Sequence, residues 1–229
     1  MTCAPGKSGG RGFESRPRHQ LAAVRRGATT PTNLESRGLH APRMTEGKWA
    51  SRFLAAAVVQ GAIGFVLASV LLYLAVLGRP AASRIVAGGG AGTWFVVGVI
   101  GYGLVGILAV AVSSLFYHHV ESTLGFPYKG WRNYTAWAHL ILGGGVGSAA
   151  ALLTAYGGYV AGAAMQPASV GGGGQDFAYV HEFILGPLVV PIAALIGLSL
   201  LGFFIGGVGY VTAWRAALKA ARPTAKGPG

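Results

Sequence analysis

Four histidines follow Met44, and their imidazole rings are the groups in that part of the chain best suited to chemistry near neutral pH. His118 and His119 are adjacent, with Glu121 close behind them, and His139 follows later. Two neutral imidazoles can ligate a b-type haem or a copper ion, and a protonatable cluster can serve a quinol. His118, His119 and His139 are therefore the candidate cofactor-binding residues, with haem b as a possible cofactor. The identity of any metal stays open, and we assign no catalytic residue.

Gln60 is the only strongly polar residue in an otherwise apolar run, and it could join these histidines and Glu121 in one cluster. His139 shares a helical stripe with Gly143 and Gly147, which would turn it toward the interior of a bundle. The alternative is that the histidines anchor helix ends in the lipid headgroup layer, as tyrosine and tryptophan do.

His181 and Glu182, with Asp176 nearby, form a second polar group. They could mark a point of proton uptake or of partner docking. The alternative is a polar cap, because acidic side chains favour a helix N-terminus.

Four long windows without Asp, Glu, Lys or Arg must position these residues. A membrane-spanning helix needs about 20 apolar residues, so the windows predict helices at about 53–78, 93–118, 134–164 and 183–214. Pro187 and Pro191 predict a kink or a separate short helix at the start of the last one. The fold class expected is all-α, an integral membrane four-helix bundle.

Composition supports the same class. Hydrophobic residues make up 52% of the 229 residues and charged ones only 10%, whereas soluble domains carry about a quarter charged residues. Glycine is abundant, with 39 residues, and small residues let membrane helices approach closely. The pairs at 143/147, 158/162 and 202/206, with Ala57 and Gly61, predict packing within the bundle; a dimer motif is the alternative.

Loop charges predict the orientation. Two basic residues, Arg79 and Arg84, would lie on one side of the membrane. The other side would carry eight, which places both termini in the cytoplasm: Lys48, Arg52, Lys129, Arg132, Arg215, Lys219, Arg222 and Lys226.

Several kinds of site are disfavoured by the sequence. Cys3 is the single cysteine, so no disulfide or thiolate metal site is expected after Met44. The glycines at 171–174 lack the Gly-Lys-Ser/Thr ending of a phosphate-binding loop. The net charge of +12 lies half in the first 43 residues and otherwise mostly beside apolar runs, so we expect no nucleic-acid partner.

Residues 1–43 hold eight basic and two acidic residues and no apolar run, which predicts a disordered basic extension. Within it, the run from Gly12 to Pro17 resembles the translation of a tRNA gene. We therefore expect translation to begin at Met44, with residues 1–43 not native; a genuine basic arm or targeting peptide is the alternative.

Four short runs carry a resemblance to a known family: Thr93-Trp94-Phe95, Phe116-Tyr117-His118-His119, Trp137-Ala138-His139-Leu140 and Val180-His181-Glu182. They resemble histidine-bearing helix fragments of haem-copper oxidase subunit I proteins, which bind haem through histidines in their helices. The resemblance implies a small subunit of a respiratory membrane assembly.

The functional prediction is a small multi-pass protein of the cell membrane, a subunit of an electron-transfer or respiratory complex with a haem or quinol site near the cytoplasmic face. We expect no enzymatic activity of the chain on its own. Its partners would be the lipid bilayer, other membrane subunits or further copies of itself. The alternatives are a small oligomeric transporter or channel, whose path would be unusually poor in polar groups, and a purely structural membrane protein.

Overall fold

The computed structural model describes residues 47–221, and within them it is all-helical, as the sequence predicts. The predictions for residues 1–43, including the start at Met44, fall outside the described residues, as do Cys3, Arg222 and Lys226. Four helical runs are long and apolar enough to cross a membrane: Lys48–Val76, Ala91–Thr123, Trp131–Met165 and Phe177–Ala221. We refer to them as segments 1 to 4.

Segment 1 is the single α-helix α1 (Lys48–Val76), whereas the other segments combine α-helical and π-helical turns. Segment 2 contains α3 (Ala91–Gly101), η1 (Tyr102–Ala109), α4 (Val110–His118) and η2 (His119–Thr123). Segment 3 contains α5 (Trp131–Ala138), η3 (His139–Val146) and α6 (Gly147–Met165). Segment 4 contains α7 (Phe177–Tyr179), η5 (Val180–Leu185) and α8 (Gly186–Ala221). The short helices α2 (Ala82–Ala87) and η4 (Ala168–Val170) lie in the connections.

The prolines of segment 4 do not separate a short helix from the main span, which corrects that expectation. α8 begins at Gly186 and continues through Pro191. The irregular stretch is the π-helical η5, which directly precedes α8 and ends two residues before Pro187. A proline ring conflicts with the carbonyl four residues earlier. For Pro187 this carbonyl lies in η5, where the wider π turn changes the spacing of the carbonyls, so the helix can continue past Pro187. For Pro191 it lies within α8, which continues there without a π turn.

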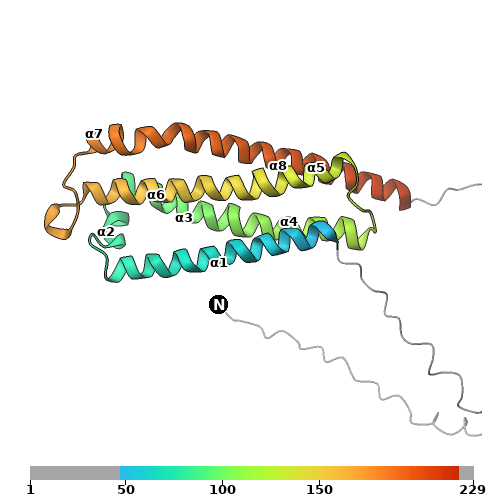
Figure 1. Cartoon of the computed structure of the whole chain (residues 1–229), viewed down its shortest axis with the longest axis horizontal. Coiled ribbons are helices and arrows are strands. Elements are labelled where there is room, and N and C mark those ends of the chain that lie inside the picture. The colour runs from blue at the N-terminus through green and yellow to red at the C-terminus, as the bar shows by residue number, and fades with distance from the viewer. Residues whose placement is uncertain (1–46, 222–229) are drawn as a thin grey trace, which may run out of the picture. The chain divides into compact units, whose positions relative to one another are not determined.

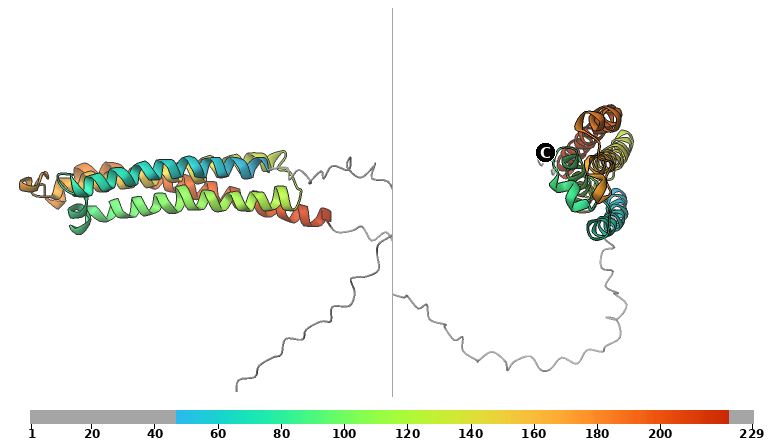
Figure 2. Two further views of the ribbon diagram at one scale, coloured as in Figure 1. Left: turned by 90° about the horizontal axis from the view of Figure 1, so that it is seen from below. Right: turned by 90° about the vertical axis from the view of Figure 1, so that its left-hand side faces the viewer.

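The segments form a diamond in cross-section, with segments 2 and 3 in the middle and α1 and α8 on the outside (Figures 1 and 2). α3 and α6 are packed tightly against each other, whereas α4 and α5 diverge: α4 packs on α1 and α5 packs on α8. We call one end of the bundle the Trp49 end, because the start of α1, where Trp49 lies, is found there. The end of η2, the start of α5 and the last turns of α8 lie at the same end (Figure 1). The opposite end carries α2, η4 and α7.

Glycine makes the tight contacts within the bundle, as expected. A Cβ atom at Gly158 would overlap the backbone of Phe95, and one at Gly98 would overlap the backbone of Ala155. On the other side of segment 3, Gly202 lies against the backbone of Gly143. Gly61 differs, because a Cβ there would meet no atom within 4 Å. The pairs of segments 3 and 4 therefore pack inside the bundle, and Gly61 of α1 does not.

Candidate functional site

All four segments meet around His139, the first residue of η3. Its ring lies 5.0 Å from that of Phe53 of segment 1, 5.9 Å from Tyr117 of segment 2 and 5.3 Å from Phe203 of segment 4, measured between centroids. Gly206 of α8 faces the same ring, and a Cβ there would overlap it. The divergence of α4 and α5 makes room for the imidazole, and aromatic rings fill the space around it.

Two side chains of α4 contact the ring nitrogens. The Tyr117 hydroxyl lies 3.3 Å from Nδ1, and Ser113 Oγ lies 3.4 Å from Nε2. Ser113 donates its one hydrogen to the carbonyl of Ala109, 2.7 Å away. Ser113 must therefore accept from Nε2, which assigns the ring proton to Nε2 and leaves Nδ1 to accept from Tyr117. One neutral tautomer satisfies both contacts.

A cavity of about 330 Å³ opens beside this ring, between α4 and α8. Apart from the edges of Ser113, His139 and two tyrosines, its lining is apolar: Ala109, Val112, Ser113, Phe116, Tyr117, His139, Phe203, Gly206, Gly207, Tyr210 and Val211. The site thus combines flat aromatic walls with one imidazole.

Glu121 does not join His139, which corrects the expected cluster. Its Oε2 accepts hydrogen bonds from the backbone N–H groups of Trp49 at 2.8 Å and Ala50 at 3.2 Å. These are among the first N–H groups of α1, which have no partner inside the helix. Gly47 leaves room for the carboxylate, because a Cβ there would contact it closely. Glu121 therefore caps α1 from the end of segment 2.

Replacing Glu121 with alanine is expected to lower the free energy of unfolding by about 1–2 kcal/mol, because two helix-terminal N–H groups lose their acceptor. Glu121→Gln should lower the free energy of unfolding by less, because the glutamine amide oxygen can still accept hydrogen bonds from these N–H groups. Reversible unfolding in detergent measures both, with exposed Glu182→Ala as the matched control. An alanine variant as stable as the wild type would contradict the capping role.

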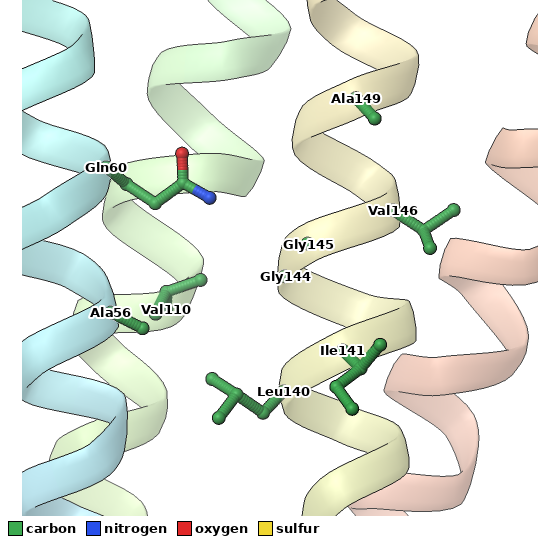
Figure 3. Close-up of a pocket in the computed structure, with 9 residues that line it drawn as sticks. All are labelled: Ala56, Gln60, Val110, Leu140, Ile141, Gly144, Gly145, Val146 and Ala149. Atoms are coloured by element: carbon green, nitrogen blue, oxygen red, sulfur yellow. The ribbon is translucent and has the colours of Figure 1, made fainter.

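Gln60 also lies apart from His139. The Tyr102 hydroxyl lies 2.6 Å from Gln60 Oε1 and 2.9 Å from its carbonyl oxygen, which ties segments 1 and 2 together. The Gln60 side chain borders a second cavity, of about 370 Å³, between α1 and segment 3 (Figure 3). Leu140 and Gly144 are among its apolar lining.

His118 and His119 are exposed, whereas His139 lies within the bundle. His118 borders a separate cavity against Ser51 and Ser114, at the edge of α1. The predicted pairing of His118 or His119 with His139 is therefore wrong, and these residues do not fit a haem held between two histidines. Within residues 47–221, no three His, Cys, Asp or Glu residues come close enough to hold a metal ion.

At the opposite end, Asp176 caps the start of α7, as the alternative reading of that polar group predicts. Its Oδ1 accepts a hydrogen bond from the N–H of Tyr179 at 2.7 Å. His181 is exposed and stacks on Phe177, with ring centroids 5.9 Å apart. Glu182 is also exposed. These three residues do not form a pocket with His139, which lies toward the other end.

Tyr128, in the connection between segments 2 and 3, extends the aromatic cluster outward. Its ring lies 4.9 Å from that of Tyr117. Burial raises the pKa of its hydroxyl, with a smaller contribution from the Glu121 carboxylate. The hydroxyl makes no hydrogen bond within residues 47–221 and stays protonated.

The residues that sequence reasoning missed are the partners of His139. Tyr117, Ser113, Phe53 and Phe203 were not among the candidate residues. The spacing of Ser113 and Tyr117, one helical turn apart, was the available signal, since it places both on one face of α4. Nothing in the sequence pointed to the two phenylalanines from distant segments.

We compared the chain with protein-family models, with curated proteins and with solved structures, and it matches none of them.

Proposed function

We propose that the chain is an integral protein of the cell membrane, with the Trp49 end and both termini in the cytoplasm. Four apolar segments of spanning length support insertion. The charges support the orientation, because cytoplasmic loops are enriched in Lys and Arg. Arg79 and Arg84 lie toward the opposite end, whereas six described basic residues lie at the Trp49 end: Lys48, Arg52, Lys129, Arg132, Arg215 and Lys219.

Single cysteines test this orientation, because Cys3 is the single cysteine of the sequence. In a Cys3→Ser background, Ser169→Cys and Thr123→Cys place exposed thiols at opposite ends of the bundle. An impermeant maleimide applied to intact cells should label the first, and the second only after permeabilisation. The reverse pattern, or labelling of both thiols in intact cells, would overturn the single orientation, and labelling of both only after permeabilisation would contradict membrane insertion.

We further propose that the chain binds a quinone ring in the cavity beside His139, as a subunit of a membrane electron-transfer complex. The observation that carries this is the imidazole at the wall of an aromatic cavity, with its proton assigned to Nε2. A quinone carbonyl can accept from that N–H in place of the weak contact to Ser113. The flat ring suits the aromatic walls, since aromatic pairs favour stacked or edge-to-face contact.

The chain's own residues then bind and orient the ring and exclude water from it. Tyr117 fixes the tautomer of the imidazole by donating to Nδ1, which keeps the ring proton on Nε2. Electrons would come from or go to a redox centre of a partner subunit. Haem is not part of the proposal, because His118 and His119 do not face His139.

A binding titration tests the quinone site. The full chain in lipid nanodiscs is titrated with a tail-free benzoquinone while its tryptophan fluorescence is followed, since Trp49 and Trp137 adjoin the aromatic cluster. Saturable quenching is expected. Quenching that rises linearly without saturation would overturn the proposal. If ion flux through proteoliposomes were found instead of saturable binding, the result would support a transporter.

A further inference from the structure

An apolar groove lies between segment 2 and α8, next to the His139 cavity. α8 packs on segment 3 and meets segment 2 mainly at η2, so these two elements stay apart over most of their length. A cavity of about 230 Å³ occupies the middle of this gap. Phe203 lines both this cavity and the one beside His139, so the two adjoin at its side chain.

We infer that this groove holds the hydrocarbon tail of the bound quinone, so that the ligand is a polyprenyl quinone of the membrane and not a tail-free ring. The inference rests on the proposed quinone site and adds the substrate class to it.

The lining of the groove presents hydrocarbon throughout. Two hydroxyl residues lie along it, and both hydroxyls are engaged by backbone carbonyls. Thr154 donates to the carbonyl of Ala150 at 2.8 Å, and Ser199 donates to that of Gly143 at 3.0 Å. The remaining lining is aliphatic, glycine or the Phe203 ring: Val97, Gly98, Gly101, Val105, Gly147, Ala150, Ala151, Ile196, Leu200 and Phe203. An occupant with hydrogen-bond acceptors along its length would find no free hydroxyl donor there.

The groove also runs along the bundle axis. On segment 2 it is lined from Val105 to Val97, about 12 Å at the helical rise per residue. A ring held at His139 therefore has an apolar groove beside it for the first part of a tail that extends away from the Trp49 end.

The glycines of segment 2 offer a matched pair of variants. Gly101 lines the groove, and a Cβ there would meet that of Ala151 at 3.6 Å, an ordinary contact. Gly103, two residues later, would meet nothing within 4 Å and does not line the groove. Leucine at position 101 should therefore fill the groove, whereas leucine at position 103 should leave it open.

The test compares a tail-free benzoquinone with the same ring carrying a polyprenyl tail, using the full chain in nanodiscs. Concentrations are expressed as mole fractions in the bilayer, so that partitioning of the tail does not count as affinity. The wild type and Gly103→Leu should bind the tailed quinone at least about tenfold more tightly. Gly101→Leu should bind the tail-free ring as the wild type does and lose most of that advantage, because leucine occupies the path of the tail.

Two results would overturn the inference while leaving the ring site intact: a wild type that binds both quinones equally, or a Gly101→Leu variant that keeps the tail advantage. A change of oligomeric state on Gly101→Leu with no tail advantage in the wild type would assign the groove to a helix of a second copy. Absence of saturable binding of the tail-free ring would remove the proposed site and the inference together.

Discussion

Replacing Gly158 with alanine is expected to destabilise the bundle by about 3 kcal/mol, a large effect for one added methyl group. The added Cβ would overlap the backbone nitrogen and the Cα of Phe95. Backbone atoms cannot turn aside as a flexible side chain can, so α3 and α6 must separate. Close packing is a main source of helix association in a bilayer, and the separation loses dispersion contacts along both helices.

Unfolding of purified protein in detergent measures the effect, with Gly103→Ala as the control because its methyl group meets no neighbour. Both variants replace a helical glycine by alanine, so both gain the same intrinsic helix propensity. Equal stability of the two variants would show that α3 and α6 are not in contact as described.

Replacing His139 with phenylalanine is expected to weaken binding of the tail-free quinone by about tenfold or more. Phenylalanine keeps an aromatic ring against Phe53 and Phe203 but lacks the Nε2 proton. A lost hydrogen bond in an apolar site amounts to about 1–3 kcal/mol, and each 1.4 kcal/mol is about a tenfold change in affinity. The tryptophan quenching titration gives the dissociation constant.

His118→Phe is the matched control for this variant, because it makes the same substitution at an exposed histidine. It should bind the quinone as the wild type does. His139→Phe also leaves the Tyr117 hydroxyl without its partner, so the unfolding transition of each variant is measured alongside. A folded His139→Phe protein with unchanged affinity would remove His139 from the site.

Much of the fold follows from the sequence. The four uncharged windows predicted the four long helices, and the structure extends each by a few residues at one or both ends, as in α1 from Lys48. The glycine pairs at 158/162 and 202/206 were correctly expected to pack inside the bundle. The predicted separation at Pro187 was wrong, because a π turn before it lets the helix continue.

The candidate site was only partly predictable. His139 was expected to face the interior because it shares a stripe with Gly143, and it does lie among the rings of three other segments. The partners expected for His139 were wrong, because neither Glu121 nor Gln60 contacts its ring. Glu121 instead reaches the first N–H groups of α1, and Gln60 pairs with Tyr102.

The sequence by itself determined that the chain forms four long apolar helices, since length and hydropathy act along the chain and need no knowledge of which helices are neighbours. Tertiary structure alone decided which side chains meet. Segments 2 and 3 are held together at α3 and α6 by glycine and diverge at α4 and α5. That divergence brings Phe53, Tyr117 and Phe203 around His139 and leaves the groove beside α8 open. It depends on backbone contacts between segments far apart in the chain, which no local pattern encodes.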